Sequence, residues 1–199
     1  MPSTPLARHF FTMACNNAWA NHRMLGACRR LSRADFAAPR TGFFPSLKAT
    51  LNHNLTVDWY YVDALERAFR GEPPNRDVDR FFDPAEPFAT CAELAAEQQA
   101  VDRRLVAACG AATDDLLAAP VPVMRRAGLA HEGATRLLAH LFQHQIHHRG
   151  QAHAMLAGTK VKPPQLDEFF CANEARLRAA ELAELGLSEA AIWGEPSTR

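Results

Sequence analysis

The sequence predicts an all-α protein built as a four-helix bundle with an extra C-terminal helix. Helix-forming Ala, Leu, Glu, Arg and Gln are frequent, and runs of β-branched residues are nearly absent. Four long segments carry apolar residues at helical spacing, and stretches rich in Pro and Gly separate them. Because 199 residues suffice for one hydrophobic core, we expect a single domain over residues 1–199.

The first half of the chain contains two predicted helices. The first runs from about residue 5 to residue 31, where "SRAD" and then "PRTG" interrupt it. Ser46 is a suitable N-cap for the second helix, which continues through about Phe69. The segment "GEPPNRD" ends this helix, because two adjacent prolines cannot continue it.

The second half contains the remaining predicted elements. After a loop at "FFDPAEPF", a third helix in "ATCAELAAEQQAVDRRLVAAC" stops at Gly110. The segment "LLAAPVPVMRRAGLAHEG" predicts either a short extended hairpin or only a loop. The fourth helix runs from about Gly133 to Leu156 and ends at Gly158. A final helix over about 165–185 follows the spacer "KVKPP".

The charge balance excludes some classes of partner. Lys plus Arg and Asp plus Glu each number 22, so the formal net charge is zero. This balance gives no electrostatic reason to expect binding of nucleic acid or of an anionic membrane surface. A protein without net charge is prone to self-association, so we expect a homodimer or another homo-oligomer.

The cysteines and the N-terminus indicate a cytoplasmic protein. Five cysteines are scattered without a CxxC pair, which disfavours a zinc ribbon, a thioredoxin-type site and a disulfide framework. The N-terminal segment lacks the profile of a signal peptide. No stretch approaches the roughly 18 apolar residues of a membrane span.

Four of the nine histidines lie in "HLFQHQIHHRGQ", residues 140–151, on the fourth predicted helix. Because helical residues advance by about 100°, His144 and His148 point toward the apolar face of the helix. His140 and His147 lie on its shoulder. Two imidazoles at positions i and i+4 lie roughly 5–6 Å apart and can bind one ion. The spacing favours a metal site over the alternative, in which each ring hydrogen-bonds a buried partner.

His53 is the candidate for a third ligand. It lies in the middle of the second predicted helix, one turn before Val57, and can also face inward. Three histidines that leave one coordination position open are typical of a catalytic site. The neighbouring Asp58 is expected either to orient an imidazole or to pair with an arginine such as Arg149.

Several established catalytic motifs are absent from the sequence. Gln145 follows His144, so the HExxH general base of zinc proteases is missing. No Glu-x-x-His occurs, which excludes the di-iron carboxylate bundles. The patterns GxSxG, GxGxxG and GxxxxGK[ST] are absent too, so nothing indicates a serine nucleophile or a nucleotide.

Four further residues have two interpretations each. Arg149 falls off the apolar face, which predicts a solvated or capping arginine. Gly150 indicates either a close approach of another helix or a tolerated defect, since glycine costs about 1 kcal/mol in a helix. Tyr60 and Tyr61 either line the site or only pack against the core.

Three segments together resemble the DinB family of damage-inducible, YfiT-like metalloproteins. They are "NNAWANHRML", "FFPSLKATLNHNLTVDWYYVDAL" and "LLAHLFQHQIHHRGQAHAML", and the similarity continues through "PPQLDEFF" and the closing helix. The resemblance implies a bundle in an up-up-down-down arrangement, commonly dimeric. It also implies a divalent metal ion, with zinc or nickel expected, bound by His53, His144 and His148.

The resemblance also assigns the neighbouring positions. His140 and His147 match positions that are not ligands in the family. Trp19 and Asn21 match the "WAN" element of the first helix, where Trp19 is expected to pack and Asn21 to satisfy a buried polar group.

Two functional hypotheses follow from the resemblance. The first is a metal-dependent enzyme, a thiol transferase or a hydrolase, in which the metal activates a low-molecular-weight thiol or water. The second is a non-catalytic stress-response protein in which the metal is structural or sensed. A role in DNA repair finds no support, because the chain has no basic patch.

Overall fold

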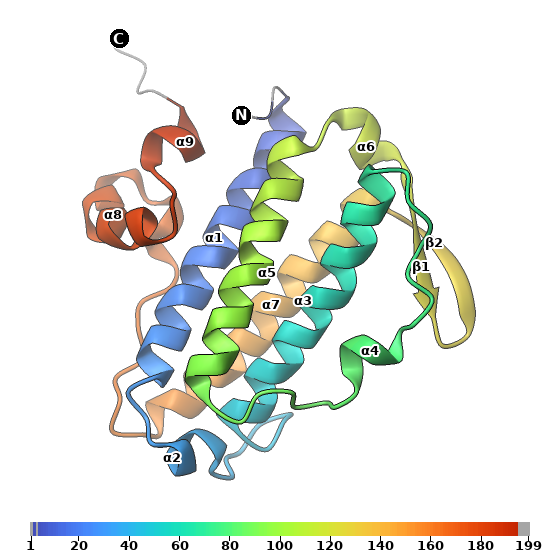
Figure 1. The fold of residues 1–199 in the computed structure, drawn as a ribbon. Coiled ribbons are helices and arrows are strands. Elements are labelled where there is room, and N and C mark those ends of the chain that lie inside the picture. The colour runs from blue at the N-terminus through green and yellow to red at the C-terminus, as the bar shows by residue number, and fades with distance from the viewer. Residues whose placement is uncertain (1, 3, 195–199) are drawn as a thin grey trace.

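Four long helices packed side by side form the body of the molecule within residues 2 and 4–194, which the computed structural model describes (Figure 1). The all-α fold class is therefore confirmed. The four bundle helices are α1 (Pro5–Cys28), α3 (Leu47–Phe69), α5 (Cys91–Ala111) and α7 (Ala134–Ala157). Around the bundle, α1 contacts α5 and α7, and α3 contacts the same two helices.

The directions of these helices follow from their connections. In Figure 1, α1 and α7 run down the view, whereas α3 and α5 run up. The long segment 70–90 returns to the lower end of the bundle, so α3 and α5 are parallel. The order along the chain is therefore down, up, up, down, which differs from the up-up-down-down order that the resemblance implies.

Hydroxyl side chains start three of the long helices, as N-caps do. The Thr4 hydroxyl accepts a hydrogen bond from the backbone N–H of Ala7, and Ser46 caps α3 as predicted. A capping box of Thr90 and Glu93 starts α5. The fourth helix begins after Gly133, close to its predicted start.

Two helix ends differ from the prediction. The first helix ends at Cys28, and the residues up to Leu31 form a turn. The prediction that Gly110 stops the third helix is wrong, because α5 continues to Ala111. Gly110 does not take the positive φ with which glycine often ends a helix, and the helix ends one residue later.

Shorter elements connect the bundle helices. Of the two structures predicted for the segment before the fourth long helix, the hairpin is the one observed. Its two strands are antiparallel, and the pairing begins with Pro120 opposite Gly133 and ends with Arg125 opposite Gly128. Val121 and Val123 are buried under it. The strands of the hairpin are β1 (Pro120–Arg125) and β2 (Gly128–Gly133). Three short helices were not predicted: α2 (Arg33–Ala37), α4 (Asp79–Phe82) and α6 (Asp114–Ala118).

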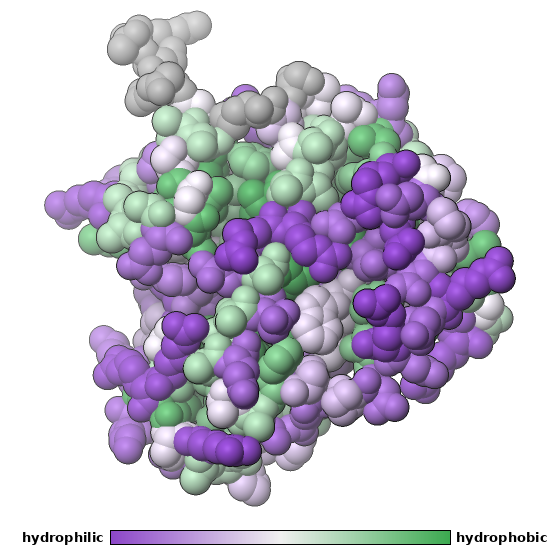
Figure 2. Space-filling view, in the orientation of Figure 1, coloured by the Kyte–Doolittle hydropathy of each residue, from purple (hydrophilic) through white to green (hydrophobic). Residues whose placement is uncertain are grey.

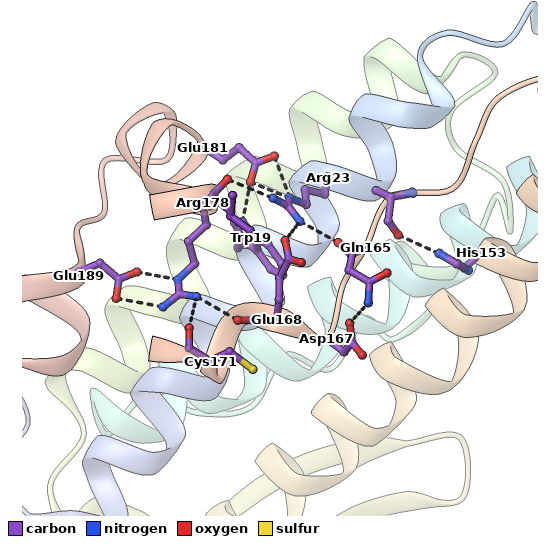
Figure 3. Close-up of polar contacts among 12 residues, drawn as sticks. Trp19, Arg23, His153, Gln165, Asp167, Glu168, Cys171, Arg178, Glu181 and Glu189 are labelled. Atoms are coloured by element: carbon purple, nitrogen blue, oxygen red, sulfur yellow. Dashed lines mark hydrogen bonds and ion pairs between the residues drawn. The ribbon is translucent and has the colours of Figure 1, made fainter. Parts of the chain in front are cut away.

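The C-terminal region does not form the single helix predicted over 165–185. It contains η1 (Glu168–Phe170), η2 (Ala172–Glu174), α8 (Ala175–Glu184) and α9 (Glu189–Trp193). The buried Arg178 explains the break: its guanidinium donates to the backbone carbonyls of Glu168 and Cys171, at 3.0 and 3.1 Å. It also pairs with Glu189 at 2.6 Å (Figure 3). The segment therefore folds around a charged side chain rather than continuing as one helix.

The same region is fastened to the first bundle helix. The Trp19 indole N–H donates to Glu181 at 2.8 Å, and the Arg23 guanidinium lies 4.3 Å from the centre of the Trp19 ring. Arg23 pairs with both Glu181 and Glu168 (Figure 3). Trp19 is fully buried, which confirms its predicted packing role.

The apolar core fills the space between the four long helices and continues under the hairpin. On the face seen in Figure 2, hydrophilic residues spread over the side that carries the hairpin, and apolar residues gather near α1 and α8. Among the helices of the described residues, none has both the length and the apolarity to cross a bilayer. The five cysteines are all free thiols.

Candidate metal centre

The structure brings together the three histidines that the sequence singles out. His53 comes from α3, and His144 and His148 come from α7. The Nε2 atoms of His53 and His144 are 2.9 Å apart. One ring nitrogen from each of the three residues lies within 4.8 Å of the others. This spacing is small enough for one ion to contact all three imidazoles.

The helical phase of α7 differs in part from the prediction. His140 and His147 are exposed and His148 is buried, but His144 is only half-buried. The prediction that Arg149 is solvated or caps the helix is wrong, because its side chain is 5% exposed. The reason is that α7 packs against both α1 and α3, so its buried arc is wider than one apolar stripe.

An aromatic loop covers the histidines. The ring centre of Phe44, in the connection before α3, lies 4.4 Å from that of His53 and 5.5 Å from that of His148.

Burial, reinforced by the charge of His148, lowers the pKa of His53 to about 4. Burial and the neighbouring imidazoles lower the pKa of His144 to about 3. Both rings are therefore neutral near pH 7, the form in which imidazole binds a metal.

A hydrogen bond orients the third ring. The Nδ1 atom of His148 lies 3.1 Å from the side-chain oxygen of Gln151, whose amide nitrogen lies 2.9 Å from Nε2 of His147. Donation from Nδ1 to Gln151 leaves Nε2 of His148 free to bind an ion, as in metal sites where an outer hydrogen bond fixes the tautomer. Three imidazoles form a donor set that suits zinc, nickel, copper or iron, so the site fits a divalent metal ion.

The comparison with protein families agrees with this geometry. The family model described as the DinB family matches residues 3–181, which include all three histidines. The chain belongs to the DinB family. No curated protein matches the chain.

Behind the histidines, this DinB protein buries a polar network between the four long helices. Each histidine is followed directly by a network residue: Asn54, Gln145 or Arg149. Because consecutive helical residues diverge by about 100°, each histidine can face the site while the next residue faces the bundle interior. The network consists of Asn17, Asn21, Asn54, Asp58, Gln98, Asp102, Gln145 and Arg149, all of them buried.

Arg149 supplies the positive charge of the network. Its Nη1 donates to the side-chain oxygens of Asn17 and Asn21, both at 2.8 Å. The amides of these two residues donate in turn to Asp102, at 3.2 and 3.1 Å. Asn21 thus satisfies buried polar groups, as predicted. Burial lowers the pKa of Arg149 to about 10, which keeps the guanidinium charged near pH 7.

Asp58 does not orient an imidazole, and the charge of Arg149 acts on it without a direct ion pair. Its Oδ2 accepts a hydrogen bond from Gln98 at 2.7 Å, and Gln98 also donates to Asp102 at 3.2 Å. Within the described residues, no hydrogen bond joins Asp58 to an imidazole or to Arg149. Burial, reinforced by the charge of Asp102, raises the pKa of Asp58 to about 8. Asp58 is therefore a neutral acid near pH 7.

The raised pKa of Asp58 predicts a pH effect on stability. A carboxyl group whose pKa is higher in the folded state binds more protons there, so folding weakens as the pH rises toward that pKa. We expect the wild type to lose about 1–2 kcal/mol of unfolding free energy between about pH 6.5 and 8, relative to Asp58→Asn. Urea unfolding of both proteins at several pH values measures this difference. Parallel pH profiles would show that Asp58 does not hold its proton in the folded state.

A cavity of about 430 Å³ opens beside His144. Tyr60 and Tyr61 line it and are also buried in the core, so the structure supports both interpretations of these tyrosines. Arg125 and Arg126 of the hairpin line it as well. The complete lining is Val57, Tyr60, Tyr61, Val78, Phe82, Arg125, Arg126, His140 and His144.

Sequence reasoning missed the two hairpin arginines. The available signal was their adjacency in "VMRRAG", at the tip of a predicted hairpin. Nothing in the sequence places that tip beside His144. A smaller cavity of about 190 Å³ reaches His53 between Phe44 and Phe82. Each cavity thus reaches one of the three histidines, His144 or His53.

Gly150 does not mark a close helix contact. A Cβ atom added at this position would meet nothing within 4 Å. Of the two interpretations, the tolerated glycine is therefore the one that fits.

Proposed function

We propose that this protein is a metal-dependent enzyme that acts through a small thiol or a water molecule. One observation carries the proposal: three imidazoles converge where a cavity opens to solvent beside His144. A divalent ion bound there would act as a Lewis acid and lower the pKa of a thiol or water at its open position.

The side chains around the histidines support this proposal. His53, His144 and His148 would hold the ion, and Gln151 would keep His148 in the tautomer that binds it. Phe44 covers His53 and His148 and limits the access of water on that side. The cavity beside His144 leaves room for a substrate. We expect zinc or nickel as the ion, and thiol transfer or hydrolysis as the type of reaction.

A coordination experiment tests the proposal. Purified protein is analysed for metal content, loaded with one equivalent of Co²⁺ and titrated with 2-mercaptoethanol while its visible absorption is recorded. We expect one ion per chain and a spectral change on addition of the thiol, because a three-histidine site leaves one position exchangeable. A spectrum that responds neither to thiol nor to pH would contradict catalysis and favour a structural ion.

The homodimer and the cytoplasmic location stay predictions. Size-exclusion chromatography with light scattering at several protein concentrations tests the first.

A further inference from the structure

We propose that Arg125 and Arg126 form a binding site for an oxyanion group, a carboxylate or a phosphate, of the substrate. The proposal rests on the proposed function, since the same cavity leads to His144. Both arginines line the cavity, although they come from the hairpin rather than from a bundle helix. Arginine is suited to this task because its planar guanidinium binds carboxylate and phosphate oxygens in pairs.

The hairpin is held firmly against α3. The Tyr60 hydroxyl donates to the backbone carbonyl of Met124 at 2.6 Å, and Val121 and Val123 are buried below the strands. Figure 1 shows the hairpin beside the bundle on the side of α3 and α4. Arg125 and Arg126 directly follow the anchored Met124, so the hairpin presents them at a defined place.

The described lining of the cavity offers no carboxylate to the two arginines. The described carboxylate closest to pairing with Arg125 belongs to Glu132, at 3.7 Å, which is longer than a charge-assisted hydrogen bond. Arg126 has no ion pair among residues 2 and 4–194. None of the described residues that line the cavity is acidic. An anionic ligand in the cavity would therefore meet the solvent-exposed charge of Arg126 and the loosely paired charge of Arg125, and no carboxylate of the lining.

A chain of contacts through Tyr61 and His140 joins Arg125 to His144. Arg125 donates to the Tyr61 hydroxyl at 3.2 Å. The Tyr61 ring centre is 5.4 Å from that of His140, which is 6.0 Å from that of His144. A ligand with its oxyanion on the arginines must extend past Tyr61 and His140 to reach an ion on His144.

Part of the cavity wall is apolar. Val57, Val78 and Phe82 provide this part, and the volume of about 430 Å³ lies within the range of small-molecule sites. The inferred substrate is a small molecule with a metal-binding end, an apolar middle and an oxyanion at the other end.

Paired ligands test the inference on zinc-loaded protein. Titration calorimetry compares glutarate with monomethyl glutarate, and 3-mercaptopropionate with its methyl ester. A fifth ligand, 2-mercaptoethyl phosphate, distinguishes phosphate from carboxylate recognition. We expect each fully charged ligand to bind about tenfold more tightly than its ester, as a charge-assisted bond in a partly enclosed site does.

Variants assign this preference to the arginines. The double variant Arg125→Gln/Arg126→Gln should bind acid and ester equally while its affinity for the esters stays unchanged. Arg33→Gln, an exposed arginine of α2 outside the cavity, is the matched control and should retain the preference.

Two results would overturn the inference: equal binding of acid and ester by the wild type, or a preference that survives in the double variant. Neither result contradicts the proposed function if thiols still change the visible absorption of the cobalt-loaded protein. Conversely, a cobalt spectrum insensitive to thiols would contradict the thiol route, and the glutarate pair would still test the arginine site.

Discussion

Replacing His148 with alanine is expected to abolish stoichiometric binding of a divalent metal ion. The change removes one of three converging imidazoles, and the remaining pair of His53 and His144 leaves a site with only two protein ligands. Mutation of a mere outer hydrogen-bonding partner typically lowers metal affinity 10- to 100-fold, so loss of a ligand should lower it by more than about a hundredfold. Metal analysis after dialysis and competition with a chromophoric chelator measure this loss.

His147→Ala is the matched control on the same helix. His147 is exposed and touches the site only through Gln151, at 2.9 Å. Its removal should lower metal affinity by no more than about tenfold, the lower end of outer-partner effects. Equal losses in His147→Ala and His148→Ala would mean that the three converging histidines are not the ligands.

Replacing Arg149 with alanine is expected to destabilise the folded protein by about 3–5 kcal/mol. The variant leaves the Asp102 carboxyl group buried without its nearby cation, and it removes the donor to Asn17 and Asn21. Loss of one partner from a buried charged group is costly because the remaining group stays desolvated. Urea unfolding of the metal-free protein measures the change without a contribution from the ion.

Arg136→Ala provides the comparison for Arg149→Ala. Arg136 lies on the same helix, but its side chain is exposed, so its replacement should change stability by less than about 0.5 kcal/mol. Similar effects of the two substitutions would contradict a central role of Arg149 in the buried network. A stability loss confined to Arg149→Ala, with metal affinity preserved, would assign the network to the bundle rather than to the ion.

The parts of the fold that depend on local sequence could be predicted. Ser46 marks the start of the second long helix, Gly133 and Gly158 bracket the fourth, and the proline-containing segment forms the hairpin. The convergence of His53 with His144 was also predictable, because both lie on helical faces that turn inward. Whether these residues bind a metal stays a prediction.

The features that sequence analysis missed depend on long-range packing. Arg149 lies on the side of α7 opposite His140. That side is buried only because α7 packs against α1 as well as against α3. Arg178 interrupts the C-terminal helix because it bonds carbonyls seven and ten positions earlier in the chain. The direction of the third long helix was set by the path of the segment 70–90, which carries no periodic signal of its own.

The separation of His53 and His144 along the chain has a consequence for the polymer as a whole. These two residues lie 91 positions apart, on helices joined through half of the chain. An ion bound to both closes a loop of that length, as a disulfide would, and a permanent cross-link over about 100 residues restricts the unfolded chain by roughly 4–5 kcal/mol. His144 and His148 alone close a loop of only one helical turn. His53 is therefore the residue that would turn metal binding into a reversible cross-link of the fold.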